Sequence, residues 1–166
     1  MKKRVLVFVL LGMMLMTAGK VSALELFADD FDATTSVLVG WKRNNTSYVT
    51  KYTGSYKKGL AAMRLRKNYY AYTYINVAPF KNMVLNFKMA AYSLEGTEYV
   101  RCQYKKDNGS WVTAKTLSNG SDNGVYRSYS VSIANCNVLQ IRFIMGGADT
   151  GDYGYIDDVV LTGARK

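Results

Sequence analysis

From position 24 onward the chain consists of short segments in which apolar and polar residues alternate, and no segment has the three-to-four-residue spacing of an amphipathic helix. In "VLNFKMA" (84–90), for example, Leu85, Phe87 and Met89 alternate with polar residues. Because successive side chains of a strand point to opposite faces, a period of two predicts a strand with one buried face. The sequence therefore predicts an all-β fold.

Turn-forming residues separate these segments. Asn108 and Gly109 form the dipeptide that most strongly predicts a β-hairpin, here between strands near 98–105 and 111–117, and "SNGSDNG" (118–124) predicts a second turn. Strands are also expected within 25–31, 47–53, 60–66, 70–77, 84–90, 129–133, 139–145 and 153–161. About nine to ten short strands in a single domain over 24–166 predict a two-sheet antiparallel sandwich of the jelly-roll kind, or a closed barrel.

The first 23 residues predict a secretory signal peptide. A basic start, "MKKR", precedes the apolar run "VLVFVLLGMMLM", and "KVSA" supplies small residues before a cleavage point after Ala23. The apolar run is short for a stable membrane span. We expect a secreted protein, extracellular or periplasmic, with an uncleaved N-terminal anchor as the alternative.

Charge argues against a nucleic-acid partner. The chain carries 22 Lys and Arg against 12 Asp and Glu, and the net charge falls from +10 to +6 without the signal, which holds four basic residues and no acid. The remaining excess is spread along the chain without a dense basic run, so acidic glycans or an anionic cell surface are the expected partners. A solvated basic surface without a specific partner is the alternative.

Cysteine and histidine content limits the chemistry. Cys102 and Cys136 are the only cysteines, and in an exported chain they predict one disulfide, with two free buried thiols as the alternative. No histidine is present, which excludes Ser-His-Asp and Cys-His catalysis in their usual forms. An enzyme built on this chain would need carboxylates, Tyr, Lys or a metal.

Outward-facing tyrosines and arginines are the candidate ligand-binding residues. In "NYYAYTYINV", Tyr70, Tyr72 and Tyr74 alternate with residues expected to face the core. Tyrosine rings stack on sugars and their hydroxyls form hydrogen bonds, although tyrosine also covers sheet faces for purely structural reasons. The same alternation places further polar residues outward, where they would form a basic groove for acidic glycans if they shared one sheet: Arg64, Arg66, Arg101, Gln103 and Arg142. Trp111 is expected to pack against its own hairpin.

The order of these elements resembles a known group of domains. "DDFD", Trp41, "VLNFKMA", "YVRCQYKKDNGSWVT", "LQIRF" and "GDYGYIDDVVLTG" are similar to the MAM-like and cleaved-adhesin-like jelly rolls, which are related in architecture to galactose-binding-like carbohydrate-binding modules. The resemblance covers the whole chain after the signal. It implies a β-sandwich used for adhesion or glycan binding, often with a structural calcium near the two termini.

Four aspartates are the candidate calcium ligands. Asp30 and Asp32 lie near the start of the domain and Asp157 and Asp158 near its end, and first and last strands of a jelly roll commonly lie close together. Clustered carboxylates suit calcium, with carbonyls of Lys58 and Gly59 completing a shell of roughly six to eight oxygens. Aspartates held by solvent or by N–H groups are the alternative. A catalytic pair is less favoured, because adjacent residues of a regular strand face opposite ways.

The expected function is therefore non-catalytic binding of carbohydrate or cell-surface glycan, with a structural calcium. A structural or protein-interaction component of the envelope or extracellular matrix is the alternative, and a small glycan hydrolase or lyase is the third. The oligomeric state and the identity of the ligand do not follow from the sequence.

Overall fold

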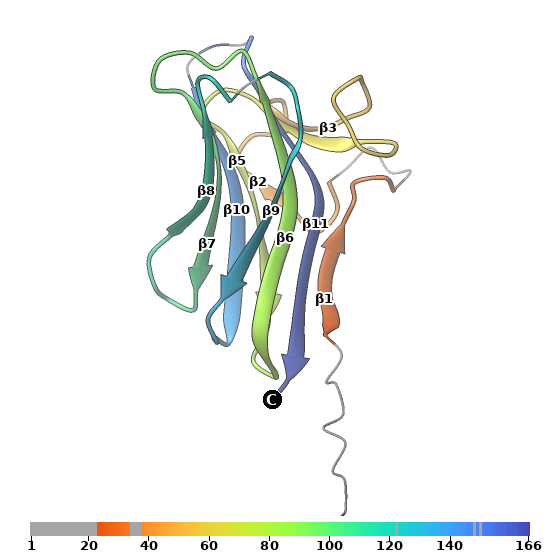
Figure 1. Cartoon of the computed structure of the whole chain (residues 1–166), viewed down its shortest axis with the longest axis vertical. Coiled ribbons are helices and arrows are strands. Elements are labelled where there is room, and N and C mark those ends of the chain that lie inside the picture. Colours follow the sequence, from red (N-terminus) through yellow and green to blue (C-terminus); the bar gives the residue numbers. More distant parts are fainter. Residues whose placement is uncertain (1–22, 34–37, 122, 148, 150) are drawn as a thin grey trace, which may run out of the picture.

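The computed structural model describes residues 23–33, 38–121, 123–147, 149 and 151–166, and contains eleven strands in this part of the chain (Figure 1). They are β1 (Leu24–Asp29), β2 (Lys42–Arg43), β3 (Val49–Tyr52), β4 (Ala62–Leu65), β5 (Tyr70–Asn76), β6 (Phe80–Tyr92), β7 (Tyr99–Lys106), β8 (Val112–Ser118), β9 (Arg127–Ile133), β10 (Val138–Gly146) and β11 (Tyr153–Arg165). The predicted signal peptide lies outside the described residues except for Ala23, so it stays a prediction. Among the residues described, no helix is long and apolar enough to span a membrane.

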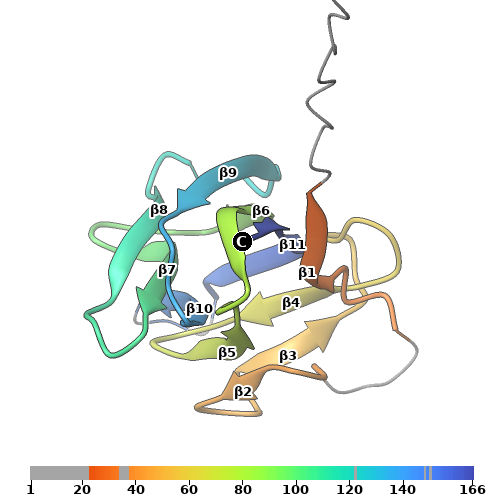
Figure 2. The same cartoon turned by 90° about the horizontal axis from the view of Figure 1, so that it is seen from below.

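The strands form two antiparallel sheets that face each other, which confirms the predicted β-sandwich (Figures 1 and 2). We call the sheet with the order β3-β4-β11-β6-β9, to which β1 adds by pairing with β11, the terminal sheet. The other has the order β2-β5-β10-β7-β8, and we call it the central sheet. All ten segments expected from alternation contain a strand, and β2 is an additional short one.

The core lies between the sheets and follows the predicted alternation. Alternate residues of β6 and β10 are buried, and rings from the two sheets meet in the middle. The ring centroids of Phe87 and Phe143 are 5.5 Å apart, and the Trp41 ring packs 5.7 Å from Phe143. Fully burying side chains of this size stabilises a fold by about 1.5–3 kcal/mol each. The period of two is thus explained by the contact between the sheets.

Along one edge of β11 the neighbouring strand is first β4 and then β1, and the change between them positions the acidic residues. β4 pairs with Gly154–Ile156, whereas β1 pairs with Val159–Gly163. Between them the ladder to β6 is interrupted by a bulge at Asp157 and Asp158, and Asp158 has a φ of +47°. The end of β1 and the segment that leads into β4 therefore meet at these two aspartates.

The hairpin predicted at Asn108 and Gly109 joins β7 to β8, as expected. The left-handed residue of its turn is Asp107, with a φ of +48°, and Gly109 donates its N–H to Lys106. The Asp107 carboxylate accepts the N–H groups of Asn137 and Val138, both at 2.9 Å, and these bonds lower its pKa. This aspartate therefore ties the hairpin to the start of β10.

The predicted disulfide is wrong, because Cys102 and Cys136 are both free and buried. Cys102 lies opposite Phe143 in the β7–β10 ladder, whereas Leu139 lies opposite Lys106. Cys136 precedes Leu139 and lies beyond that end of the ladder, where its neighbour Asn137 donates to Asp107. Four residues of strand, about 13 Å, separate Phe143 from Leu139, and a disulfide requires Cα atoms within about 7 Å.

We expect thiol labelling to show two free cysteines with different reactivity. Burial raises the pKa of the fully buried Cys102 thiol, so this residue should resist a thiol reagent until the protein unfolds. Cys136, 6% exposed in a loop, should react sooner. Denatured protein without reductant should give two thiols per chain, and a chain mass two hydrogens lower would contradict the assignment.

Candidate functional site

Tyr70, Tyr72 and Tyr74 form an outward stripe along β5, as predicted, because Ala71, Thr73 and Ile75 face the core. Neighbouring rings of the stripe are 6.0 and 5.4 Å apart and are tilted by 46° and 74°. Tyr74 is 52% exposed, and the Lys42 ammonium of β2 lies 5.2 Å from its ring. A depression of about 420 Å³ beside this ring is lined by Gly40, Lys42, Thr73 and Tyr74.

Arg142 of β10 lies at the centre of the same face. It is directly opposite Tyr72 on one side and Gln103 of β7 on the other. Its Nε donates to Gln103 Oε1 at 3.0 Å, and its Nη2 donates to the same oxygen. The guanidinium stacks over Trp111 at 4.1 Å and lies 5.4 Å from Tyr70, and partial burial lowers its pKa. Both the ring contacts and the hydrogen bonds hold it in place.

Arg101, also on β7, extends this face toward the β6–β7 loop. Its guanidinium stacks 3.6 Å from the Tyr99 ring, and its Nε is buried without a hydrogen-bond partner among the described residues. We call the surface made by β5, β10 and β7, together with Lys42 of β2 and Trp111 before β8, the central face. It consists of Tyr70, Tyr72, Tyr74, Tyr99, Arg101, Gln103, Trp111, Arg142 and Lys42.

Arg64 and Arg66 do not join that face, so the single basic groove that the sequence suggested is divided. Both arginines belong to the β4 region, and β4 pairs with β3 and β11 in the terminal sheet. They lie on the outer surface of that sheet, because Met63 and Leu65 face the core. The structure therefore brings together six of the eight predicted ligand residues and places the other two on the opposite side of the sandwich.

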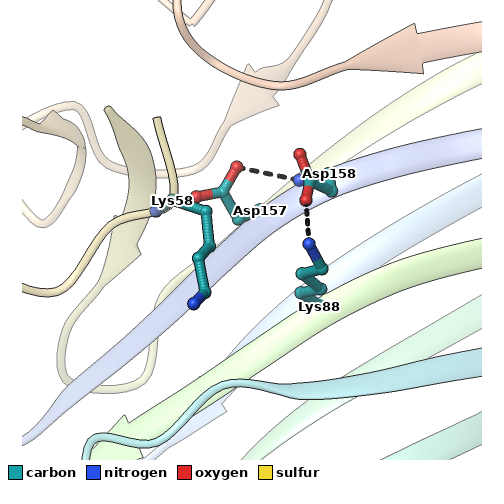
Figure 3. A network of polar contacts seen from close by, with 4 residues as sticks. All are labelled: Lys58, Lys88, Asp157 and Asp158. Atoms are coloured by element: carbon teal, nitrogen blue, oxygen red, sulfur yellow. Dashed lines mark hydrogen bonds and ion pairs between the residues drawn. The ribbon is translucent and has the colours of Figure 1, made fainter. Parts of the chain in front are cut away.

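Asp157 is fully buried at the bulge of β11 and holds the segment before β4 (Figure 3). Its Oδ2 accepts the Lys58 N–H at 2.8 Å, and its Oδ1 accepts the Asp158 N–H at 2.8 Å. Burial raises the pKa of this carboxyl to about 6, with a smaller opposite effect from the two N–H donors. Asp32 is near enough to raise it further by charge repulsion.

Asp32 holds the same segment from the other side. Its Oδ1 accepts the N–H groups of Leu60 and Ala61 at 2.6 and 2.8 Å. Gly59, with a φ of +70°, lies so close that an added Cβ would be 2.2 Å from Asp32 Oδ2. The expected proximity of Asp32, Asp157 and the segment at Lys58 and Gly59 is therefore present.

The other two predicted metal ligands have different partners. Asp158 forms an ion pair with Lys88 of β6 (Figure 3), and exposed Asp30 accepts the Asp32 N–H at 3.0 Å. Within the described residues, no group of three or more His, Cys, Asp or Glu side chains could hold a metal ion. The hydrogen bonds of Asp32 and Asp157 match the alternative in which N–H groups hold the carboxylates, and calcium stays a prediction.

Sequence reasoning missed several residues of these sites. Asp29 accepts the N–H of Phe31 and the indole N–H of Trp41, both at 2.8 Å, and nothing in "ADDFDA" distinguishes it from its acidic neighbours. Lys42 was missed because β2 has only two residues. Trp111 lies over Arg142, two strands away, and does not pack only on its own hairpin.

Comparison with known proteins identifies the fold. No family model matches the chain, and no curated protein does. Among solved structures, the xylan-binding domain CBM22-1 of Paenibacillus barcinonensis Xyn10C aligns with a TM-score of 0.61 at 7% identity, over 87% of this chain and 97% of that chain. TmCBM61 in complex with β-1,4-galactotriose gives 0.58 at 14% identity, over 77% and 90%.

A cleaved adhesin domain is equally similar. The K3 domain of Lys-gingipain from Porphyromonas gingivalis gives a TM-score of 0.57 at 12% identity, over 85% of this chain and 99% of that chain. Identities this low show a shared fold and leave the ligand open. The chain has the all-β, two-sheet jelly-roll fold that carbohydrate-binding modules and cleaved adhesin domains share.

Proposed function

We propose that this chain binds carbohydrate through the central face, as a non-catalytic module exported from the cell. The single observation that carries the proposal is the cluster around Arg142, where one immobilised guanidinium lies among Tyr70, Tyr72, Gln103 and Trp111. Aromatic rings offer apolar surfaces to sugar C–H groups, and the fixed polar groups offer hydrogen bonds to hydroxyls. Structural similarity to modules whose names record binding of xylan and galactotriose supports it.

The cost of ordering side chains favours this face as a binding surface. Arg142 already has two hydrogen bonds to Gln103 and contacts two rings, and Gln103 Nε2 in turn donates to Thr113 at 3.1 Å. Immobilising a long side chain on binding costs about 0.5–1.5 kcal/mol, and here folding has largely met that cost. A rigid, partly exposed arginine with neighbouring rings is therefore suited to a weakly held ligand such as a sugar.

The acidic residues are better explained by structural roles than by catalysis. Asp157 is fully buried under the segment before β4, and Asp158 is paired with Lys88, so neither resembles an acid or base open to a substrate. We propose that calcium adds to this arrangement, with Asp32 and Asp157 as protein ligands. The proximity of the Asp32 and Asp157 carboxylates supports this, since a cation between them would offset their repulsion.

Binding to neutral polysaccharides tests the function. In affinity electrophoresis with xylan or β-1,4-galactan, we expect the wild-type chain to be retarded and Tyr72→Ala or Arg142→Gln to lose at least about tenfold in affinity, about 1.4 kcal/mol. Lys81→Ala, an exposed residue on β6, serves as the control and should bind as the wild type does. No retardation by any neutral or acidic polysaccharide, together with concentration-dependent self-association, would instead favour the structural or protein-interaction role.

A further inference from the structure

The outer surface of the terminal sheet carries a second cluster of tyrosines and arginines, which we call the terminal face. Its members come from β3, β4, β6, β11 and the loops next to β3. They are Tyr48, Tyr52, Tyr56, Tyr92, Tyr153, Tyr155, Arg64 and Arg66. They share one side because Arg64 lies opposite Tyr155, and Tyr153 lies opposite Tyr92. Gly154, between the two tyrosines, and Ile156, after them, face the core.

The tyrosine rings of this face form a connected surface. Tyr155 is buried beneath the other rings and contacts Tyr52 at 5.2 Å, Tyr56 at 5.1 Å and Tyr153 at 6.1 Å. Tyr92 closes the group by contacting Tyr56 at 5.5 Å and Tyr153 at 6.5 Å, and it is 43% exposed. Large aromatic surface of this extent on an outer face is a feature of interaction sites.

Two guanidinium groups alternate with these rings. Arg64 lies 4.8 Å from the ring of Tyr52 and 5.7 Å from that of Tyr153. Arg66 lies 5.3 Å from Tyr153 and 5.8 Å from Tyr48. Ring stacking orients an arginine without neutralising its charge, and a planar guanidinium can then receive a carboxylate through two hydrogen bonds.

Arg64 and Arg66 are the charged side chains of the terminal face. The two carboxylates at the bulge of β11 have partners of their own: Asp157 accepts two backbone N–H groups, and Asp158 pairs with Lys88. The only side-chain oxygen bonded to Arg64 in the described structure is the Thr50 hydroxyl, at 3.4 Å, and its Nε has no hydrogen-bond partner there. An incoming carboxylate would therefore meet a cation that no protein carboxylate within the described residues neutralises.

The loop that carries Tyr56 is held in place before any ligand arrives. The Tyr126 hydroxyl donates to the Tyr56 carbonyl at 3.4 Å, and two residues later the Lys58 N–H donates to Asp157. Gly124, with a φ of +75°, lets the Tyr56 ring approach so closely that an added Cβ would be 2.4 Å from the ring. The acidic residues at the bulge therefore also organise one edge of the terminal face.

We propose that the terminal face is a second binding site, for an acidic polysaccharide whose sugars carry carboxylates, such as a polyuronate. The rings would cover the C–H faces of the sugars, and Arg64 and Arg66, two residues apart on one side of β4, would bind carboxylates recurring along the chain. The site lies on the opposite side of the sandwich from the central face and does not depend on it. A chain with both sites could link two polysaccharide strands.

The test uses the full chain with the central face disabled at its centre by Tyr72→Ala and Arg142→Gln, so that the contribution of the terminal face is measured against a low background. We expect this variant to bind polygalacturonate in isothermal titration calorimetry and affinity electrophoresis. Adding Arg64→Gln should weaken binding at least tenfold, and adding Tyr92→Ala, which removes a ring that is 43% exposed, should weaken it at least threefold. Circular dichroism and thermal melts check that each variant is folded.

Arg127→Gln is the matched control, because it removes the same charge from an exposed position on β9. If Arg127→Gln and Arg64→Gln lowered the affinity for polygalacturonate equally, the binding would be non-specific charge attraction, and the proposal would be overturned. Absence of polygalacturonate binding by the disabled chain would overturn it as well, whatever the wild type does with xylan or galactan. Sedimentation showing a dimer that Tyr92→Ala dissociates would instead assign this face to a second copy.

Discussion

Replacing Asp157 with Ala is expected to lower the free energy of unfolding by about 3 kcal/mol, a large share of the stability of a domain this size. The substitution leaves the N–H groups of Lys58 and Asp158, both in partly buried hydrogen bonds, without their acceptor, and an unsatisfied donor shielded from water costs about 1–3 kcal/mol. It also releases the segment before β4 from β11. Urea unfolding at pH 7 measures the loss.

Asp158→Ala is the matched control, one residue away. It removes the partly exposed ion pair with Lys88, which should contribute less than about 1 kcal/mol, and it places Ala at a φ of +47°, which should cost about 1 kcal/mol more. Asp157→Asn keeps one acceptor oxygen and should lie between the two. Equal losses for Asp157→Ala and Asp158→Ala would show that the buried hydrogen bonds of Asp157 do not hold this junction.

Without calcium, the contribution of Asp157 to stability is expected to fall as the pH rises from about 4 to about 6. The folded-state pKa of Asp157 is raised to about 6 from the ordinary 3.8, so in this interval the folded chain retains a proton that the unfolded chain has released. The contribution of Asp157 to stability is largest below its pKa in the unfolded chain. It is lost as the pH rises through its pKa in the folded chain, and it is constant at higher pH. Two pH units correspond to about 3 kcal/mol.

The difference between wild type and Asp157→Asn isolates this effect. Asp107, whose pKa is lowered, contributes stability that grows with pH, but it does so equally in both proteins. The difference in free energy of unfolding between the two proteins is the difference in urea midpoint multiplied by the m-value. Plotted against pH between 4 and 7, this difference should decrease and then become constant. A flat or rising difference curve would contradict the burial of this carboxyl.

The calcium proposal is tested by the same pair of proteins. Bound calcium would favour the ionised Asp157, so at pH 7 calcium should raise the melting temperature relative to chelator, and the gain should shrink below pH 5 as protons compete. Asp157→Asn should lose the gain. If neither chelator nor added calcium changes the melting temperature, calcium is not part of the site, and the pH prediction stands unaffected.

Local alternation predicted which side of each strand faces the core, but not which strands share a sheet. Arg64 and Tyr70 are six residues apart and both face outward, as expected. They lie on opposite sides of the molecule, because the chain crosses from the terminal sheet to the central sheet between β4 and β5. Strand order depends on pairing between distant segments, which no local pattern contains.

The acidic pair and the cysteines failed to follow from the sequence for related reasons. The expectation that Asp157 and Asp158 face opposite ways assumed a regular strand, and the bulge at the change of partner from β4 to β1 turns Asp158 toward Lys88. The disulfide was inferred from an even cysteine count, which says nothing of distance. In the structure both thiols are free: Cys102 lies opposite Phe143 in the ladder, whereas Cys136 lies beyond the end of the ladder at Leu139.

The sequence by itself therefore determined the all-β class, the strand segments, the buried faces and the candidate side chains, because alternation and turn residues act over a few neighbours. Only the tertiary structure decided the rest. It divided the tyrosines and arginines between two outer faces, left both thiols free, and brought Asp32 and Asp157 to the segment that leads into β4. These outcomes depend on which distant strands pair and in which register. Burial of the whole apolar core stabilises that pairing, so no short segment of the sequence determines it.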